Sequence, residues 1–153
     1  MANAAAFLAV FSLRSWRLGE RLYWVGVSEN TVAKQIVDAA YRVHTTLGPG
    51  LLESVYEAAL AYELEKRGLR TARQQAIPVV YDAVRIQTGF HCDLLVEDQV
   101  IVEIKALEGI APVHKKQLLT YLRLADKRLG LLINFNVALI KDGITRIANG
   151  LKE

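Results

Sequence analysis

The chain has 153 residues, of which 52% are hydrophobic and 23% charged, while Gly and Pro together account for only 13. This composition is globular and excludes collagen-like, disordered and disulfide-rich classes. The net charge of +3 is uneven, because residues 1–28 carry +2 and the other 125 residues carry only +1. A nucleic-acid partner would therefore need a local basic patch, since the bulk charge would not attract it.

The number of cysteines indicates the cellular compartment and excludes some kinds of metal site. Cys92 is the only cysteine, so an internal disulfide, a four-cysteine zinc site and an iron–sulfur cluster held by four cysteines are excluded. A reducing compartment is the natural setting for such a chain. We therefore expect a cytoplasmic location.

The N-terminal segment is unlike the rest. Residues 4–11 read AAAFLAVF, which is too short to span a bilayer and lacks the preceding basic region of a secretory signal. We expect residues 1–28 to form an extension, either disordered or an added helix. Residues 29–153 then form one domain, and no membrane contact is expected.

Two helices are predicted first. Asn30 and Thr31 are cap-type residues that open a helix, which ends at the Gly-Pro-Gly turn of residues 48–50. A second helix is predicted over residues 51–67, with Gly68 as its C-terminal stop. The short turn indicates that the two helices pack against each other.

Strands follow. Residues 71–81 alternate in hydrophobicity, with Pro78 indicating an edge or a bulge, and Asp82-Ala83 is a turn. Residues 85–96 and 100–105 are the next two strands, separated by residues 97–99.

The last third of the chain predicts one more helix and two or three strands. Pro112 suits the first turn of a helix. Residues 129–137 form an apolar strand typical of burial on both faces. Asp142-Gly143 predicts a hairpin between residues 138–141 and 144–147. The whole pattern predicts one α/β domain.

Chemistry concentrates on the strands around Asp93 and Glu103. Alternation puts Glu103 and Lys105 on one face of their strand, whereas Val100, Val102 and Ile104 take the other face. A three-residue loop pairs Val96 with Val100 and sets Asp93 opposite Glu103. Directly opposed like charges are unfavourable in a sheet, unless a cation lies between them.

Two carboxylates, a backbone carbonyl and water are how proteins hold Mg²⁺ for work on phosphates. Asp93, Glu103 and the Ile104 carbonyl are therefore candidate metal ligands, with Lys105 able to orient an attacking water and offset charge in the transition state. The alternative is an ordinary exposed Glu–Lys pair with Asp93 in a turn, because such surface pairs are common and weak.

These residues resemble a known family. Asp93, nine residues, and then Glu103-Ile104-Lys105 resemble the signature of the PD-(D/E)XK nuclease superfamily. The segment from Gly50 through Glu53 to Tyr56 resembles the motif of its GxxExxY proteins, and the likeness extends over residues 29–151. It implies a restriction-endonuclease-like core, in which helix, helix, three strands, helix and two to three strands build a mixed central sheet flanked by helices. It also implies a Mg²⁺-dependent nuclease for DNA or RNA, with Mn²⁺ as a substitute.

Glu53 has two interpretations. With Gly50 as N-cap, Glu53 takes the third helical position, where a glutamate often caps the helix start and the helix dipole favours it. Gly50, however, has no side chain to complete a capping box. The resemblance implies instead that Glu53 faces the metal, directly or through water, as a further catalytic acid.

Gln117 and Tyr121 stand four residues apart on one helix face. Their polar atoms either reach solvent or, as the resemblance implies, border the active site. There Gln117 would hold a substrate phosphate or the lysine, and Tyr121 would contact the sugar–phosphate backbone. His114, one turn earlier, is a third candidate for substrate binding.

A different class of function is kept open. The chain could be a non-catalytic module that retains the nuclease fold to bind nucleic acid or protein. The intact set of Asp93, Glu103 and Lys105 favours the enzyme, whereas the near-neutral body favours a weak or accessory role. A homodimer is also left open.

Overall fold

The computed structural model describes residues 16–18, 21–23 and 26–151. Strands β1 (Trp16–Leu18) and β2 (Arg21–Tyr23) pair antiparallel in a small sheet of their own. These six positions are therefore strand and not helix. The remainder of the predicted extension, residues 1–15, 19–20 and 24–25, lies outside the described residues, so the domain boundary near residue 28 stays a prediction. No described helix is long and apolar enough to cross a membrane.

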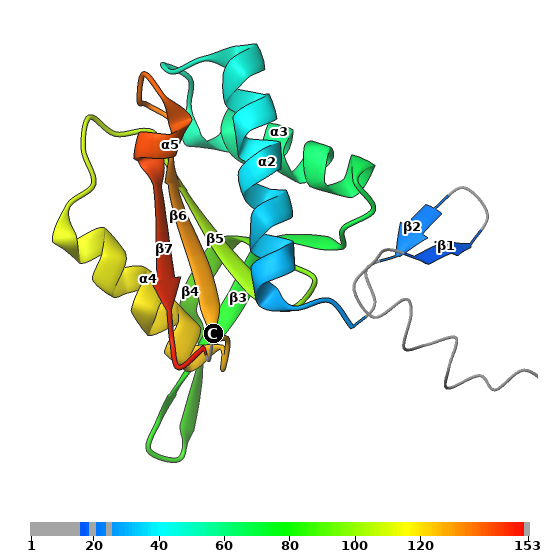
Figure 1. Cartoon of the computed structure of the whole chain (residues 1–153). Helices are drawn as coiled ribbons and strands as arrows, with labels where there is room; N and C mark the ends of the chain where they lie inside the picture. Colours follow the sequence, from blue (N-terminus) through cyan, green and yellow to red (C-terminus); the bar gives the residue numbers. More distant parts are fainter. Residues whose placement is uncertain (1–15, 19–20, 24–25, 152–153) are drawn as a thin grey trace, which may run out of the picture.

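A five-stranded sheet forms the centre of the molecule (Figure 1). Its order is β3 (Thr71–Tyr81), β4 (Val84–Val96), β5 (Val100–Lys105), β6 (Leu129–Asn134) and β7 (Ile144–Ala148). Only the β5–β6 pair is parallel, which makes the sheet mixed. Helices α2 (Glu29–Leu47) and α3 (Glu53–Lys66) lie on one side of the sheet and α4 (Pro112–Leu124) on the other. The predicted mixed sheet flanked by helices is confirmed.

The central strand β5 separates two hydrophobic clusters. Val100, Val102 and Ile104 belong to the larger cluster, which includes the apolar faces of α2 and α3. Ile101 belongs to the smaller cluster with Leu118 of α4. The predicted alternation of β5 is therefore confirmed, and it points Glu103 away from the larger core.

The predicted register of the β4–β5 hairpin is also confirmed. Val96 pairs with Val100 and Leu94 with Val102 across a three-residue loop. Glu97 and Asp98 adopt φ values of 53° and 54°, as required by a turn that follows the right-handed twist of the strands. This register brings Asp93 and Glu103 to neighbouring positions where the ladder ends.

Both helix starts differ from the prediction. Helix α2 begins at Glu29 because Ser28 is its N-cap and accepts from the Thr31 N–H. Helix α3 begins at Glu53 with Leu52 as N-cap, so Gly50 is not the cap and Glu53 is the first helical residue. The cause is Tyr56, whose hydroxyl donates to the Gly48 carbonyl at 2.5 Å and keeps residues 48–51 in a turn.

The predicted hairpin at Asp142-Gly143 is wrong. These residues end the one-turn helix α5 (Ile140–Gly143), which leads directly into β7. A Cβ atom on Gly143 would lie 2.1 Å from the carbonyl oxygen of Asn134. Glycine is therefore required for close approach of two backbones and does not signal a turn between strands.

Candidate active site

Asp93 lies where β4 and β5 stop pairing. Beyond the Leu94–Val102 pair, the Oδ2 atom of Asp93 accepts a hydrogen bond from the Ile104 backbone N–H at 2.7 Å. A side chain thus takes the place of the next ladder hydrogen bond. The other oxygen, Oδ1, accepts from the Gln74 amide at 3.3 Å. The half-buried carboxylate is held from both neighbouring strands.

Glu103 is the buried acid of the site, with only 5% of its surface exposed. Its Oε1 atom is buried and has no hydrogen-bond partner among the described residues. Burial, followed by the negative charge of Asp93, raises the pKa of Glu103 from 4.5 to about 8. An orphaned carboxylate oxygen beside a second carboxylate fits a divalent cation, which would supply the missing partner.

Asp93 and Lys105 are two further charged groups next to Glu103. Burial raises the pKa of Asp93 and the charge of Glu57 adds to this, while the Ile104 N–H, the Gln74 amide and Lys105 oppose it. The positive charge of Lys105 lowers the pKa of both Asp93 and Glu103. Lys105 is half-buried, and within residues 26–151 it forms no direct ion pair. Its ammonium group is therefore near both acids without being tied to either.

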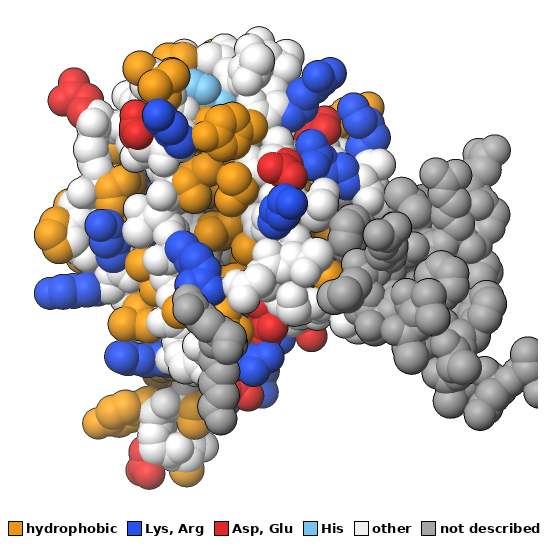
Figure 2. Space-filling view, viewed as in Figure 1, with side chains coloured by type: hydrophobic (Ala, Val, Ile, Leu, Met, Phe, Trp, Pro, Cys, Tyr) orange, Lys and Arg blue, Asp and Glu red, His pale blue; other side chains and the backbone are white. Residues whose placement is uncertain are grey.

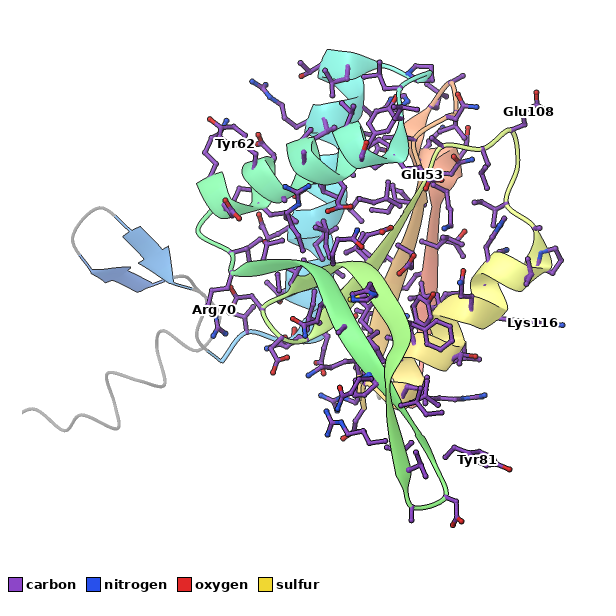
Figure 3. The ribbon with its side chains drawn as sticks, turned by 180° about the vertical axis from the view of Figure 1, so that it is seen from behind. Glu53, Tyr62, Arg70, Tyr81, Glu108 and Lys116 are labelled. Atoms are coloured by element: carbon purple, nitrogen blue, oxygen red, sulfur yellow. The ribbon has the colours of Figure 1, made fainter. Side chains whose placement is uncertain are left out.

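Glu53 reaches the end of β5 from helix α3. Its Oε1 atom accepts from the backbone N–H of Ala106 at 3.2 Å, and its charge contributes to the raised pKa of Glu103. Figure 3 shows Glu53 at the end of α3 that adjoins the sheet. The side chain is exposed. It therefore does not cap its own helix but meets the chain one residue after Lys105.

The turn that precedes Glu53 is held in place by Tyr56. This side chain is fully buried, and its ring stacks on Phe135 with a centroid distance of 4.5 Å and an interplanar angle of 7°. Its hydroxyl accepts from the Leu51 N–H as well as donating to Gly48. The spacing of Gly50, Glu53 and Tyr56 thus has a structural basis, since the tyrosine fixes the turn that leads into the helix and Glu53 is the first residue of that helix.

On the other side of the sheet, α4 contributes Gln117 and Tyr121. The Gln117 amide donates to the Tyr121 hydroxyl at 2.8 Å. Burial raises the pKa of Tyr121, and the charge of Glu103 adds to it, so this buried ring lies near the acids. His114 has a structural contact of its own. Its Nδ1 atom accepts from the Ala111 N–H at 3.0 Å and so caps the start of α4.

Two buried polar residues around the site, Glu57 and Asn134, were not predicted as site residues from the sequence. Glu57 is buried one turn after Glu53 and accepts from both Arg73 and Gln74. Its spacing of four from Glu53 is a signal that could have found it. Asn134 is buried, donates to the Leu107 carbonyl at 2.8 Å and accepts from the Leu107 N–H at 3.0 Å. It ends β6 three residues earlier than predicted and fixes the loop after Lys105.

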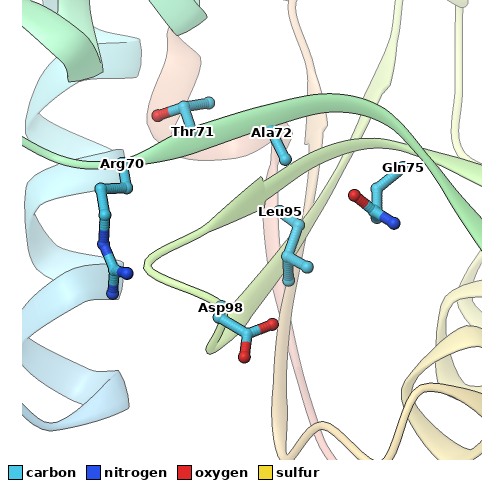
Figure 4. A pocket seen from close by; sticks show the side chains of 6 residues that line it. All are labelled: Arg70, Thr71, Ala72, Gln75, Leu95 and Asp98. Atoms are coloured by element: carbon cyan, nitrogen blue, oxygen red, sulfur yellow. The ribbon is translucent and has the colours of Figure 1, made fainter.

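A shallow pocket of about 270 Å³ lies elsewhere, against the hairpin turn between β4 and β5 (Figure 4). Its lining consists of Arg70, Thr71, Ala72, Gln75, Leu95 and Asp98. None of the candidate acids borders it. Among the described residues, no group of three or more His, Cys, Asp or Glu side chains is arranged to hold a metal. Glu53 therefore does not complete a three-acid ligand set in this geometry.

Comparisons with known proteins show the family of the chain. A family model of the PD-(D/E)XK nuclease superfamily matches residues 30–147, a stretch that contains every candidate residue of the site. Among solved structures, the chain is similar to the crystal structure of an alkaline exonuclease (LHK-Exo) from Laribacter hongkongensis. The identity is 16%, the TM-score is 0.39, and the alignment covers 80% of this chain and 82% of that chain. No curated protein matches the chain.

Proposed function

Because the chain belongs to the PD-(D/E)XK nuclease superfamily, we propose that it hydrolyses phosphodiester bonds of DNA or RNA with the help of a divalent metal ion. Mg²⁺ is the proposed ion, and Mn²⁺ is able to substitute for it. Within the superfamily, the geometry of Gly50, Glu53 and Tyr56 supports a place among the GxxExxY proteins.

Glu103 carries the proposal. The residue is only 5% exposed, one of its oxygens lacks a donor, and a second carboxylate lies beside it. Such an arrangement lowers the stability of the fold unless another group compensates for the buried charge. A cation between the two acids removes that cost. Asp93 and Glu103 would bind the ion directly, together with the Ile104 carbonyl, and Glu53 would support it through water. When bound, such an ion supplies positive charge to the scissile phosphate and lowers the pKa of a coordinated water.

Lys105 is proposed to orient the attacking water and offset negative charge on the phosphate. Its charge reaches both acids without a direct ion pair, which supports this role. Gln117 and Tyr121, held together by a hydrogen bond, would bind the substrate backbone. His114 would add a contact through its Nε2 atom, since Nδ1 is used in the helix cap.

The charge of helix α4 supports the proposal that the substrate is a nucleic acid. Its 13 residues include Lys115, Lys116 and Arg123, all exposed, and no acidic residue. Figure 3 shows Lys116 pointing away from the sheet into solvent. The positive charge of this helix would supply the local basic patch that the near-neutral body requires for a nucleic-acid partner. Figure 2 shows basic and acidic side chains interspersed over much of the face that it displays.

A second candidate is a non-catalytic module that keeps the fold for binding nucleic acid or protein. Two observations favour it: the +1 charge of residues 29–153 and the lack of a three-acid ligand group among the described residues. Loss of activity during evolution would leave the fold and the basic helix in use.

The decisive experiment tests purified protein on single-stranded, double-stranded and branched DNA and RNA, with and without Mg²⁺ or Mn²⁺. Calorimetric titration with Mn²⁺ runs in parallel, and light scattering tests whether the chain forms a homodimer. Ion-dependent cleavage by wild type, absent in Glu103→Gln, supports the nuclease. Nucleic-acid binding with no ion binding and no cleavage supports the module instead.

A further inference from the structure

Gln74 has an unusual backbone in the middle of a strand. Its neighbours Arg73 and Gln75 pair regularly with Leu94 and Cys92 across β4, yet Gln74 itself adopts a φ of 48°. This left-handed conformation is unfavourable for a residue with a side chain, and it persists only where surrounding contacts hold it. The contacts of the Gln74 side chain are therefore the place to look for a reason.

The Gln74 amide lies between two carboxylates. Its Nε2 atom lies 2.7 Å from Oε2 of Glu57 and 3.3 Å from Oδ1 of Asp93. An amide nitrogen has two N–H groups, so one is available for each acid. The reverse orientation would aim the amide oxygen at two negative charges. The chemistry of the surroundings therefore fixes which way the amide points.

Glu57 is a firm anchor for this bridge. It is buried on α3, and its Oε1 atom accepts from the Arg73 guanidinium at 2.9 Å. Both of its oxygens thus have donors from β3. The chain of contacts runs from Arg73 through Glu57 and Gln74 to Asp93, and it links helix α3 to the strand that carries the proposed metal ligand.

Asp93 is consequently held at both oxygens. The Ile104 N–H fixes Oδ2 from β5 and Gln74 fixes Oδ1 from β3. We propose that Gln74 is a positioning residue for the metal ligand Asp93, orienting its carboxylate toward Glu103 through the bridge to Glu57. This inference rests on the proposed function, because it concerns the ion-binding geometry of the same site.

A merely structural role for Gln74, tying β3 to α3, makes a different prediction. It would lower the melting temperature on substitution and leave the affinity of the folded protein for the ion unchanged. Gln74→Met keeps the length of the side chain and removes both donors. Gln74→Gly removes the donors and relieves the left-handed backbone. Gln75→Met is the matched control, since within the described part of the chain the side-chain amide of this exposed neighbour hydrogen-bonds only to the Ala76 carbonyl, at 3.4 Å.

The experiment measures Mn²⁺ affinity by calorimetry and melting temperature without metal for wild type and the three variants. Gln74→Met and Gln74→Gly are expected to bind Mn²⁺ about 10–100-fold more weakly, the usual effect of removing a residue that orients a ligand. Gln74→Gly should melt at or above the temperature of Gln74→Met, and Gln75→Met should bind as wild type does.

Two outcomes would overturn the inference, and they can be told apart. If wild type binds Mn²⁺ and both Gln74 variants bind it equally well, Gln74 is structural and the proposed function stands. If wild type itself binds no Mn²⁺, the proposed metal site fails and the positioning role fails with it.

Discussion

Two glutamates of the β4–β5 hairpin, Glu97 and Glu103, are almost equally buried, but their carboxylate oxygens differ in how many hydrogen-bond partners they have. Glu97, with 4% exposure, accepts hydrogen bonds from the backbone N–H of Arg70 and from its guanidinium, at 2.5–3.2 Å. Glu103, with 5% exposure, has an oxygen with no partner among the described residues. The two side chains are thus buried to the same extent, but only Glu97 has hydrogen-bond donors for both of its carboxylate oxygens.

The comparison separates a structural acid, Glu97, from Glu103, the proposed metal ligand. A buried carboxylate with well-placed donors fixes local geometry, and here it ties the hairpin turn to the start of β3. A buried carboxylate with one oxygen that lacks a donor is a cost that folding alone would not retain. Where a buried acid lacks partners, the missing partner is itself the functional clue.

The largest expected effect comes from removing the proposed metal ligand Glu103. Glu103→Gln should reduce ion-dependent cleavage by more than about 100-fold, because losing a ligand exceeds the usual effect of losing a residue that supports one. Asp93→Asn should do the same. Without metal, Glu103→Gln should melt at the same temperature as wild type or higher, because a buried like-charge contact is relieved. Nuclease assay and calorimetric melting test this, and a marked loss of metal-free stability would contradict it.

Lys105→Ala should also impair cleavage strongly, by about 100–1,000-fold, because a charge that stabilises the transition state is lost. Its Mn²⁺ affinity should stay close to that of wild type, since lysine is not a ligand. The measurements are Mn²⁺ titration and cleavage at saturating Mn²⁺. Equal losses of affinity in Lys105→Ala and Glu103→Gln would erase the distinction between the two residues.

The structural acid should give the opposite result. Glu97→Ala leaves the Arg70 N–H without its side-chain partner, and should lower the free energy of unfolding by about 2 kcal/mol. For a domain of this size the melting temperature should fall by about 4–8 °C. Mn²⁺ affinity of the folded protein should not change. A large loss of affinity in this variant would show that the two glutamates are not independent.

The pH dependence sharpens the comparison further. The pKa of Glu103 is about 8 in the folded protein against a reference value of 4.5, so the folded state holds this proton more tightly. Its contribution to stability is fully present below pH 4.5 and is lost as pH rises toward about 8. Without metal, the free energy of unfolding of wild type should therefore decrease relative to that of Glu103→Gln as the pH rises across this window. The decrease should be at most about 1.4 kcal/mol per pH unit. Denaturant unfolding at several pH values measures it, and a flat difference would contradict the raised pKa.

The hairpin was predictable because its information is local. Alternating apolar residues from Leu94 to Ile104 allow one register, and the structure has it. The family resemblance added the identity of the acids, which stays a prediction, and the superfamily match covers the segment that holds them. Pattern and motif agree here because both depend on the same short segment.

The errors arose where a residue serves a distant partner. Gly143 suggested a hairpin turn, but it is glycine because the Asn134 carbonyl lies against it. Glu53 was assigned to the third helical position because the anchoring of the turn by Tyr56 cannot be read from spacing. The left-handed backbone of Gln74 has no signature in the sequence at all, since glutamine is ordinary in a strand and its two partners lie 17 and 19 residues away.

The connectivity of the sheet has a consequence for how the chain folds. Asp93 and Glu103 share a hairpin closed by three residues, whereas β5 reaches its parallel partner only through α4, with Val100 pairing with Leu129. Short loops close at lower entropic cost than long crossovers, so we expect the hairpin to form first. The two acids would then meet while water still surrounds them, and their repulsion would grow as α4 and β6 dock. Divalent ions should accordingly act late, stabilising the finished sheet against unfolding and hardly changing the rate at which it forms.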